Sequence, residues 1–217
     1  MITPFVSDDL FEINNNAEIN YDSVNEVIYI DNVFLNYDDI LDLIYNIKVE
    51  SWKKSHNSRN FIDYYDCRLS YNNVNSYKKD NQLLYDLINT YFNINNKELF
   101  FRNAYTFNYF KNNIKGLTNK YQFYPHYDNA FNIIFYLDNI CNGGTAIYEN
   151  VDNWINQEEH NLFYNVEKLK IKNIIQSNPN RASIFAGNRL HGGYIDKHDI
   201  YYYNWRINMV NFVKEGL

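Results

Sequence analysis

The pattern of apolar and polar positions changes character near the middle of the chain. Two segments of the front part, residues 38–47 and 80–92, carry apolar residues every three or four positions, as one face of a helix does. The first opens with Asp38 and Asp39, which suit the positive end of a helix. Residues 26–31 are rich in β-branched and aromatic side chains. We therefore predict one short strand followed by two amphipathic helices.

From residue 99 onward, short segments dense in Phe, Tyr, Ile and Val follow one another, each bounded by Asn, Asp or Gly. The predicted strands cover residues 99–110, 121–126, 132–137, 145–148, 182–185, 191–195 and 200–213. Helices followed by a run of strands indicate a mainly β fold with flanking α-helices, in which an antiparallel sandwich or barrel carries the helices outside. One polar interruption, residues 151–180, is predicted to be a partly helical excursion of the kind that forms lids.

The length fits a single domain over residues 1–217, because the chain contains no internal repeat and no Pro/Ser-rich linker. Residues 1–98 would supply the supporting strand and helices, and residues 99–217 the β core with its insertion at 151–180. The aromatic share of 18% includes 22 Tyr, and Asn, Ile and Lys are also abundant. This bias is typical of an AT-rich genome, such as that of a phage or an AT-rich microbe, and we draw no function from it.

Charge and cysteine content exclude several classes of protein. A net charge of −6 and a pI near 5.3, without a basic cluster, argue against extended nucleic-acid binding. Cys67 and Cys141 are too few for a disulfide framework or a Cys-rich zinc module. The first residues do not resemble a secretory signal, and no window approaches the roughly 20 apolar residues of a membrane span. We expect a soluble protein of a reducing cytoplasm, without membrane association.

A candidate metal site begins in the segment Tyr124-Pro125-His126-Tyr127-Asp128. His126 and Asp128 share one face of an extended segment, because side chains alternate along a strand. A catalytic metal needs a third protein ligand. The chain has four other histidines, of which three lie in polar stretches where exposure is expected: His56, His160 and His198. His191 instead begins a predicted strand and precedes two glycines that permit close approach, so it is the favoured third ligand.

The polar stretch at residues 196–199 predicts a hairpin turn between two apolar runs. In that hairpin, His191 would lie opposite Asn204 and share its face. Because side chains alternate between the two faces of a strand, Arg206 and Asn208 would lie on the same face as Asn204. This register predicts that the positive charge of Arg206 lies close to the metal ligand His191, inside the same barrel.

Arg206 precedes an apolar strand, where a buried guanidinium requires an anion. A protein carboxylate is the ordinary partner, and a small molecule that bears a carboxylate is the sharper hypothesis beside a metal site. Two imidazoles and one carboxylate that leave three positions open are typical of non-haem Fe(II) oxygenases. A zinc hydrolase is less favoured, because that function leaves Arg206 without an anion.

The order His126-x-Asp128, His191 and Arg206, set in short strands, resembles the family of Fe(II)/2-oxoglutarate-dependent dioxygenases. The resemblance covers residues from about 99 to the C-terminus. Three local stretches are similar to the prolyl-hydroxylase-like branch and to small bacterial and phage relatives: Tyr124-Pro125-His126-Tyr127-Asp128, Ile133-Ile134-Phe135-Tyr136-Leu137-Asp138 and Gly143-Gly144-Thr145. The resemblance implies a double-stranded β-helix core, also described as a jelly roll or cupin-like fold.

The resemblance also implies roles for six residues. His126, Asp128 and His191 would bind Fe(II). Arg206 would form a salt bridge with the distal carboxylate of the cosubstrate 2-oxoglutarate, the bidentate geometry that favours Arg over Lys. Tyr136 would donate a hydrogen bond to the same carboxylate, unless it is simply a core tyrosine. Asn208 stands where some relatives have the Ser of an Arg-x-Ser pattern.

The activity implied by the resemblance is the hydroxylation of an unidentified substrate by O2, with release of succinate and CO2. A protein side chain such as proline is the substrate expected for this branch. Two alternatives stay open: an oxygenase that acts on a small molecule or nucleotide, and a non-catalytic metal-binding jelly-roll module.

Overall fold

The computed structural model describes residues 5–6, 9–47, 53–54, 62–68, 70–71, 82–94, 99–112, 121–149, 169–197 and 206–215. Helix α1 spans Tyr37–Asn46 and helix α3 spans Gln82–Tyr91. The strands are β1 (Phe5–Val6), β2 (Glu18–Asp22), β3 (Val27–Asp31), β4 (Lys53–Lys54), β5 (Ile62–Arg68), β6 (Ser70–Tyr71), β7 (Leu99–Asn112), β8 (Tyr121–His126), β9 (Phe131–Tyr136), β10 (Gly144–Tyr148), β11 (Ile171–Gln176), β12 (Arg181–Ala186), β13 (His191–Ile195) and β14 (Arg206–Glu215). Neither helix is long and apolar enough to cross a membrane.

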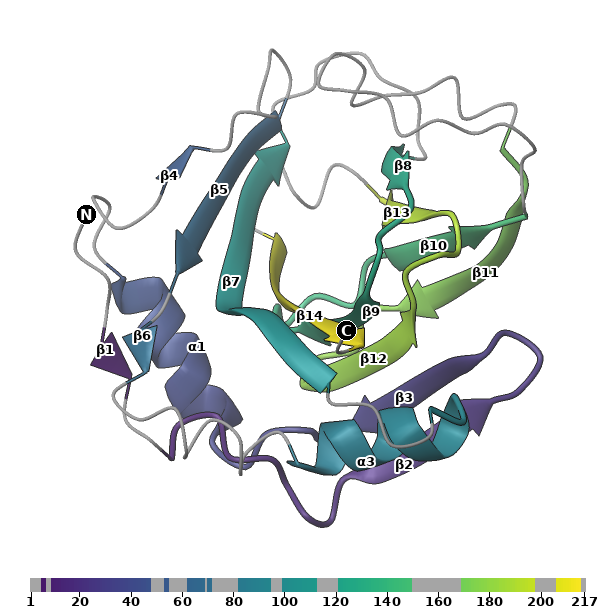
Figure 1. Cartoon of the computed structure of the whole chain (residues 1–217). Helices are drawn as coiled ribbons and strands as arrows, with labels where there is room; N and C mark the ends of the chain where they lie inside the picture. Colours follow the sequence, from purple (N-terminus) through teal and green to yellow (C-terminus); the bar gives the residue numbers. More distant parts are fainter. Residues whose placement is uncertain are drawn as a thin grey trace.

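Most of these strands form two antiparallel sheets (Figure 1). The large sheet has the order β2-β3-β12-β9-β14-β7-β5-β4, and the small sheet has the order β11-β10-β13-β8. From β7 to β14 the chain passes back and forth between them: β7, β9, β12 and β14 belong to the large sheet, and β8, β10, β11 and β13 to the small one. This alternation is a jelly roll, so the predicted double-stranded β-helix core is confirmed.

Strand β9, inside the large sheet, is buried on both faces. Its apolar residues alternate between two clusters, as a period of two requires. Ile134 and Tyr136 pack with residues of β10 and β11, which places them between the two sheets. Ile133 and Phe135 pack with the buried faces of α1 and α3 on the other side. The layers are therefore helices, large sheet, interior and small sheet.

The predicted helices at 38–47 and 80–92 and the predicted strand at 26–31 are confirmed as α1, α3 and β3, with ends that differ by one or two residues. The predicted strands of the second half correspond to β7, β8, β9, β10, β12, β13 and β14, although residues 200–205 lie outside the described residues. Five strands of the front half were not predicted: β1, β2, β4, β5 and β6.

The predicted hairpin at residues 196–199 is wrong. Strand β13 belongs to the small sheet, whereas β14 lies between β9 and β7 in the large sheet. His191 is therefore the partner of His126 on β8 and of Ile147 on β10, and not of Asn204. The reason is topological, since the chain crosses from the small sheet to the large sheet between β13 and β14, and strands of opposite sheets cannot pair with each other.

The prediction of a partly helical excursion at 151–180 is wrong for its last part. Residues 171–176 form strand β11, which pairs with β10 at the edge of the small sheet. Its apolar and polar residues do not alternate strictly, because Ile174 and Ile175 are adjacent and pack into different clusters. Residues 150–168, with His160, lie outside the described residues, as do His56 and His198.

Candidate metal centre

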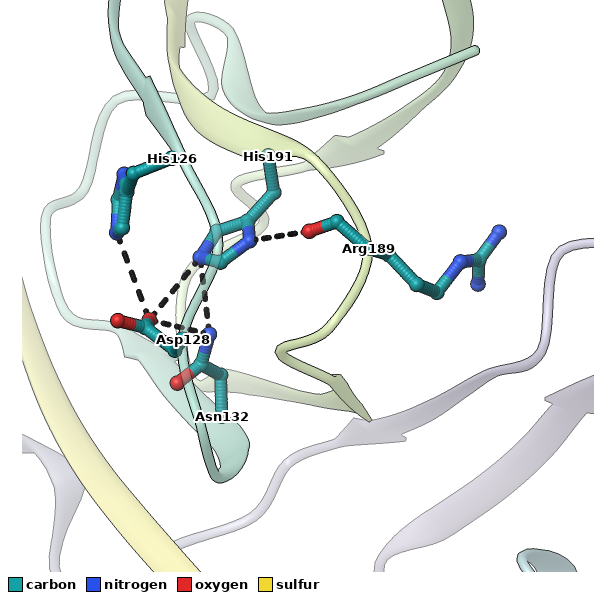
Figure 2. A network of polar contacts seen from close by, with 5 residues as sticks. All are labelled: His126, Asp128, Asn132, Arg189 and His191. Carbon is teal, nitrogen blue, oxygen red and sulfur yellow. Dashed lines mark hydrogen bonds and ion pairs between the residues drawn. The ribbon is translucent and has the colours of Figure 1, made fainter. Parts of the chain in front are cut away.

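The three predicted metal ligands come together at one end of the small sheet (Figure 2). His126 is the last residue of β8, and His191 is the first residue of β13. The two are cross-strand partners, with ring centroids 4.4 Å apart. Asp128 follows in the turn between β8 and β9, so the third ligand comes from the connection that leads to the large sheet.

One carboxylate oxygen faces both imidazoles. Oδ2 of Asp128 lies 3.4 Å from Nε2 of His126 and 3.3 Å from Nε2 of His191. Two ligand atoms that each lie about 2.1 Å from an ion at right angles to one another are about 3 Å apart. The donor atoms of all three residues lie within 4.8 Å of one another. The set therefore has the composition and spacing of a two-histidine, one-carboxylate metal site.

The tautomer of His191 is fixed by a backbone contact. Its Nδ1 lies 2.8 Å from the carbonyl oxygen of Arg189, and a carbonyl can only accept, so Nδ1 carries the proton. Nε2 then presents its lone pair toward Asp128. Burial lowers the pKa of His191, which favours the neutral imidazole that a metal requires. A hydrogen bond from the second ring nitrogen to a carbonyl is the usual support of a metal-ligating histidine.

Asp128 is held in place as an anion. Burial by itself would raise its pKa, but the charge and hydrogen bonds of His126 and His191, when these imidazoles are protonated, outweigh burial and hold the pKa well below the ordinary value. Its backbone N–H donates to the carbonyl oxygen of Gly187 at 2.7 Å, and Gly187 in turn donates to Ala130 at 2.8 Å. The turn after β12 therefore fixes the loop that carries this carboxylate.

Asn132, at the second position of β9, is part of this site and was missed by sequence reasoning. It is 1% exposed, and its Nδ2 lies 2.9 Å from Oδ2 of Asp128 and 2.9 Å from Nε2 of His191. A signal was available, because Asn132 is a polar residue on the same face as Ile134 and Tyr136 in an otherwise apolar strand.

A second polar cluster lies in the same interior, formed by Arg206 and four neighbours on β9, β10, β12 and β14. Arg206 is 4% exposed, and its Nη2 donates to the carbonyl oxygen of Gly144 at 2.6 Å. Gly144 is in the small sheet and Arg206 in the large one, so this side chain crosses the interior. We call Arg206, Tyr136, Asn208, Thr145 and Ser183 the Arg206 cluster.

The remaining members of the Arg206 cluster surround the hydroxyl of Tyr136. This hydroxyl lies 2.8 Å from Oγ1 of Thr145 and 3.5 Å from Oγ of Ser183. Burial raises the pKa of Tyr136, and the positive charge of Arg206 opposes that rise. Asn208 is the cross-strand partner of Tyr136, and its buried Oδ1 has no hydrogen-bond partner among the described residues. The three predicted cosubstrate residues therefore lie together, four residues along β9 from Asn132.

The pair Gly143 and Gly144 is required where β10 begins. Their φ angles are 89° and 145°, values that residues with a side chain rarely adopt. A Cβ at Gly143 would collide with the carbonyl oxygen of Tyr194, and one at Gly144 with that of Ile175. The two glycines allow β10 to fit between β11 and β13, and they also place the carbonyl that accepts from Arg206.

Comparisons with known proteins support the fold. No family model matches the sequence, and no curated protein matches it. A solved structure described as an oxidoreductase of the 2OG-Fe(II) oxygenase family, from Burkholderia pseudomallei, is similar with a TM-score of 0.52 and 12% sequence identity. The similarity covers 88% of this chain and 85% of that chain. The chain therefore has the double-stranded β-helix fold of a 2OG-Fe(II) oxygenase family protein, with a His-Asp-His group that could hold a metal ion.

Proposed function

We propose that this chain is a non-haem Fe(II)- and 2-oxoglutarate-dependent dioxygenase. The observation that carries the proposal is the convergence of His126, Asp128 and His191 in a jelly roll whose interior also holds a buried arginine, Arg206. The three ligands by themselves would also suit a zinc enzyme, and a buried arginine by itself would also suit a purely structural role. Together they match a metal that keeps positions open and a cosubstrate that carries a carboxylate.

The metal ligands fit ferrous iron. Two imidazoles and one carboxylate supply three donors, and their donor atoms converge on a point where a cation would bind. The side chains of His126 and Asp128 are 26% and 23% exposed, whereas His191 is 4% exposed. The cluster is thus open on one side to exogenous ligands. Bound there, Fe(II) would supply the oxidative chemistry by which 2-oxoglutarate and O2 give succinate and CO2, with the second oxygen atom of O2 transferred to the substrate.

The Arg206 cluster would hold the distal carboxylate of 2-oxoglutarate. Its guanidinium is oriented by the bond to Gly144, and a planar fork recognises a carboxylate through two parallel hydrogen bonds. The hydroxyl of Tyr136 and the carboxamide of Asn208 lie beside it.

For the substrate we propose a protein side chain such as proline. Support comes from the stretches around Tyr136-Leu137-Asp138 and Gly143-Gly144-Thr145, which are similar to the prolyl-hydroxylase-like branch. A small molecule or nucleotide is the alternative. A screen of peptides and metabolites for substrate-stimulated succinate formation would distinguish the two.

The first test is an anaerobic titration of the purified chain with Fe(II) and 2-oxoglutarate. We expect a visible charge-transfer band, followed by release of succinate when air is admitted. His191→Ala should abolish both signals, and Arg206→Ala should weaken the dependence on 2-oxoglutarate. Absence of the band and of succinate in the wild-type chain would exclude the proposed function. Metal binding without succinate would instead indicate a non-catalytic metal-binding module.

A further inference from the structure

Asn132 contacts two of the three proposed metal ligands from the opposite sheet. It lies on β9 in the large sheet, whereas His126 and His191 belong to the small sheet. Its Nδ2 is 2.9 Å from both Oδ2 of Asp128 and Nε2 of His191, as Figure 2 shows. Asn132 therefore connects the two sheets at the site itself.

Asn132 donates a hydrogen bond to Asp128. A carboxylate oxygen can only accept, so the amide of Asn132 presents an N–H group to Oδ2. Oδ2 of Asp128 is the same oxygen that faces the two imidazoles. The donor thus acts on the atom that an ion would bind.

The carbonyl oxygen of the Asn132 carboxamide shows that this residue has a cost in stability. Its Oδ1 is buried and has no hydrogen-bond partner among the described residues. A buried carbonyl oxygen without a partner destabilises the folded chain. An apolar residue would fill this position in β9 without that cost. Packing alone therefore does not account for the asparagine, whereas its contacts with the ligands do.

We propose that Asn132 is a positioning residue of the metal centre. It holds Asp128 so that the carboxylate offers one oxygen, Oδ2, to the ion. A carboxylate restrained to one oxygen leaves a further coordination position for exogenous ligands. The inference rests on the proposed function, because it requires that His126, Asp128 and His191 bind a metal.

The test uses the full chain and two variants that remove the donor. Asn132→Leu keeps a similar volume, and Asn132→Ala does not. Calorimetric titration with Mn²⁺ should show affinity about 10- to 100-fold weaker in both variants, the range for loss of a residue that orients a metal ligand. The visible absorption of bound Co²⁺, which changes with coordination number, should differ from that of the wild-type chain. The metal-free Asn132→Leu chain should unfold at an unchanged or higher temperature, because the unpartnered oxygen is gone.

A matched control removes another buried asparagine. Asn142, 4% exposed, bonds with the backbone of Lys197 through both ends of its carboxamide. Asn142→Leu should lower the unfolding temperature without changing Mn²⁺ affinity. Asn132→Gln, which keeps an amide donor, should recover part of the lost affinity.

The outcomes separate the two proposals. If the wild-type chain binds neither Mn²⁺ nor Co²⁺, the proposed function fails and the role of Asn132 fails with it. If the wild-type chain binds metal and both donor-free variants bind it equally well, with the same Co²⁺ spectrum, only the role of Asn132 is wrong. Should Asn132→Leu not fold, the comparison of Asn132→Ala with the wild-type chain decides.

Discussion

Each of two proposed metal ligands is held by a backbone group in the segment that joins β12 to β13. Asp128 donates its N–H to Gly187, and His191 donates Nδ1–H to the carbonyl of Arg189. Arg189 also reaches the carbonyl oxygen of Asn25 in the turn between β2 and β3. The geometry of the site therefore depends on this segment as much as on the ligands themselves.

Gly187 can be replaced to test that dependence. A Cβ at this position would lie 2.7 Å from Cβ of Asp128 and would collide with the carbonyl oxygen of Ala130. Gly187→Ala should therefore displace Asp128, weaken Mn²⁺ binding at least tenfold and cost about 1–3 kcal/mol of stability. Asn188→Ala, at the exposed neighbouring position of the same turn, should change neither property. Unaltered Mn²⁺ affinity in calorimetry of Gly187→Ala would contradict this account.

The function proposed for Arg206 is separate from that of the metal ligands, so its removal should have a separate effect. Truncating one partner of a buried, hydrogen-bonded charge pair costs about 2–5 kcal/mol, which is roughly 30- to several-thousand-fold in affinity. Arg206→Ala should weaken 2-oxoglutarate binding to the Mn²⁺-loaded chain by this factor and leave Mn²⁺ affinity unchanged. Lys170→Ala, which removes an exposed positive charge paired with Glu149, controls for net charge. Equal 2-oxoglutarate affinity in wild type and Arg206→Ala would exclude a carboxylate at this cluster.

Sequence reasoning reached residues that the structure brings together, but partly by a wrong route. His126 and Asp128 follow from the alternation of side chains along an extended segment, which is a local property. Arg206 was placed beside His191 through a hairpin that does not exist, and the two residues instead come from different sheets. Asn132 was missed because its role appears only when β9 of one sheet meets β8 and β13 of the other.

At the scale of the elements, Gly144 sets the start of β10. Its φ of 145° and the carbonyl oxygen of Ile175 leave no room for a side chain. We expect Gly144→Ala to lower the free energy of unfolding by more than about 2 kcal/mol, measured by urea denaturation. Ala146→Gly, on the same strand, should cost only about 1 kcal/mol. If Gly144→Ala costs no more than Ala146→Gly, the strand start is not constrained in this way.

Element existence was easier to predict than element pairing. The period of α1 and of α3 can be read from ten consecutive residues, and that of β9, β10, β12 and β13 from five or six, so the local pattern was sufficient. Which sheet a strand joins depends on partners far away in the sequence, as for β12, which pairs with β3 on one side and β9 on the other. Strand β11 was missed because the apolar and polar residues of this edge strand do not alternate strictly along the sequence.

At the scale of the whole molecule, buried tyrosines should set the alkaline limit of stability. Burial raises the pKa of Tyr37, Tyr136 and Tyr148 above the ordinary value of 10.0. The folded chain therefore keeps these phenols protonated where the unfolded chain begins to lose its protons. Their contribution is fully present below pH 10 and is lost as pH rises beyond it.

The variant Tyr148→Phe tests whether the buried tyrosines make stability fall as pH rises above 10. The hydroxyl of Tyr148 is buried and has no hydrogen-bond partner among the described residues, so its removal should leave stability at neutral pH equal or higher. The decline of unfolding free energy between about pH 10 and pH 11 should be shallower than in the wild-type chain. Urea denaturation at several pH values measures both effects. Identical slopes in the two chains would show that Tyr148 ionises equally in both states.

His126 and His191 are neighbours across the small sheet although about 65 residues of chain separate them. An ion bound by both histidines would crosslink two distant points of the chain. The loop that it closes contains strands β9 to β12, of which some belong to the large sheet and some to the small sheet. Loop-closure entropy alone would favour the folded chain by about 4 kcal/mol, as a disulfide of the same span would. A chelator would then act on this protein as a reductant acts on a disulfide-linked one.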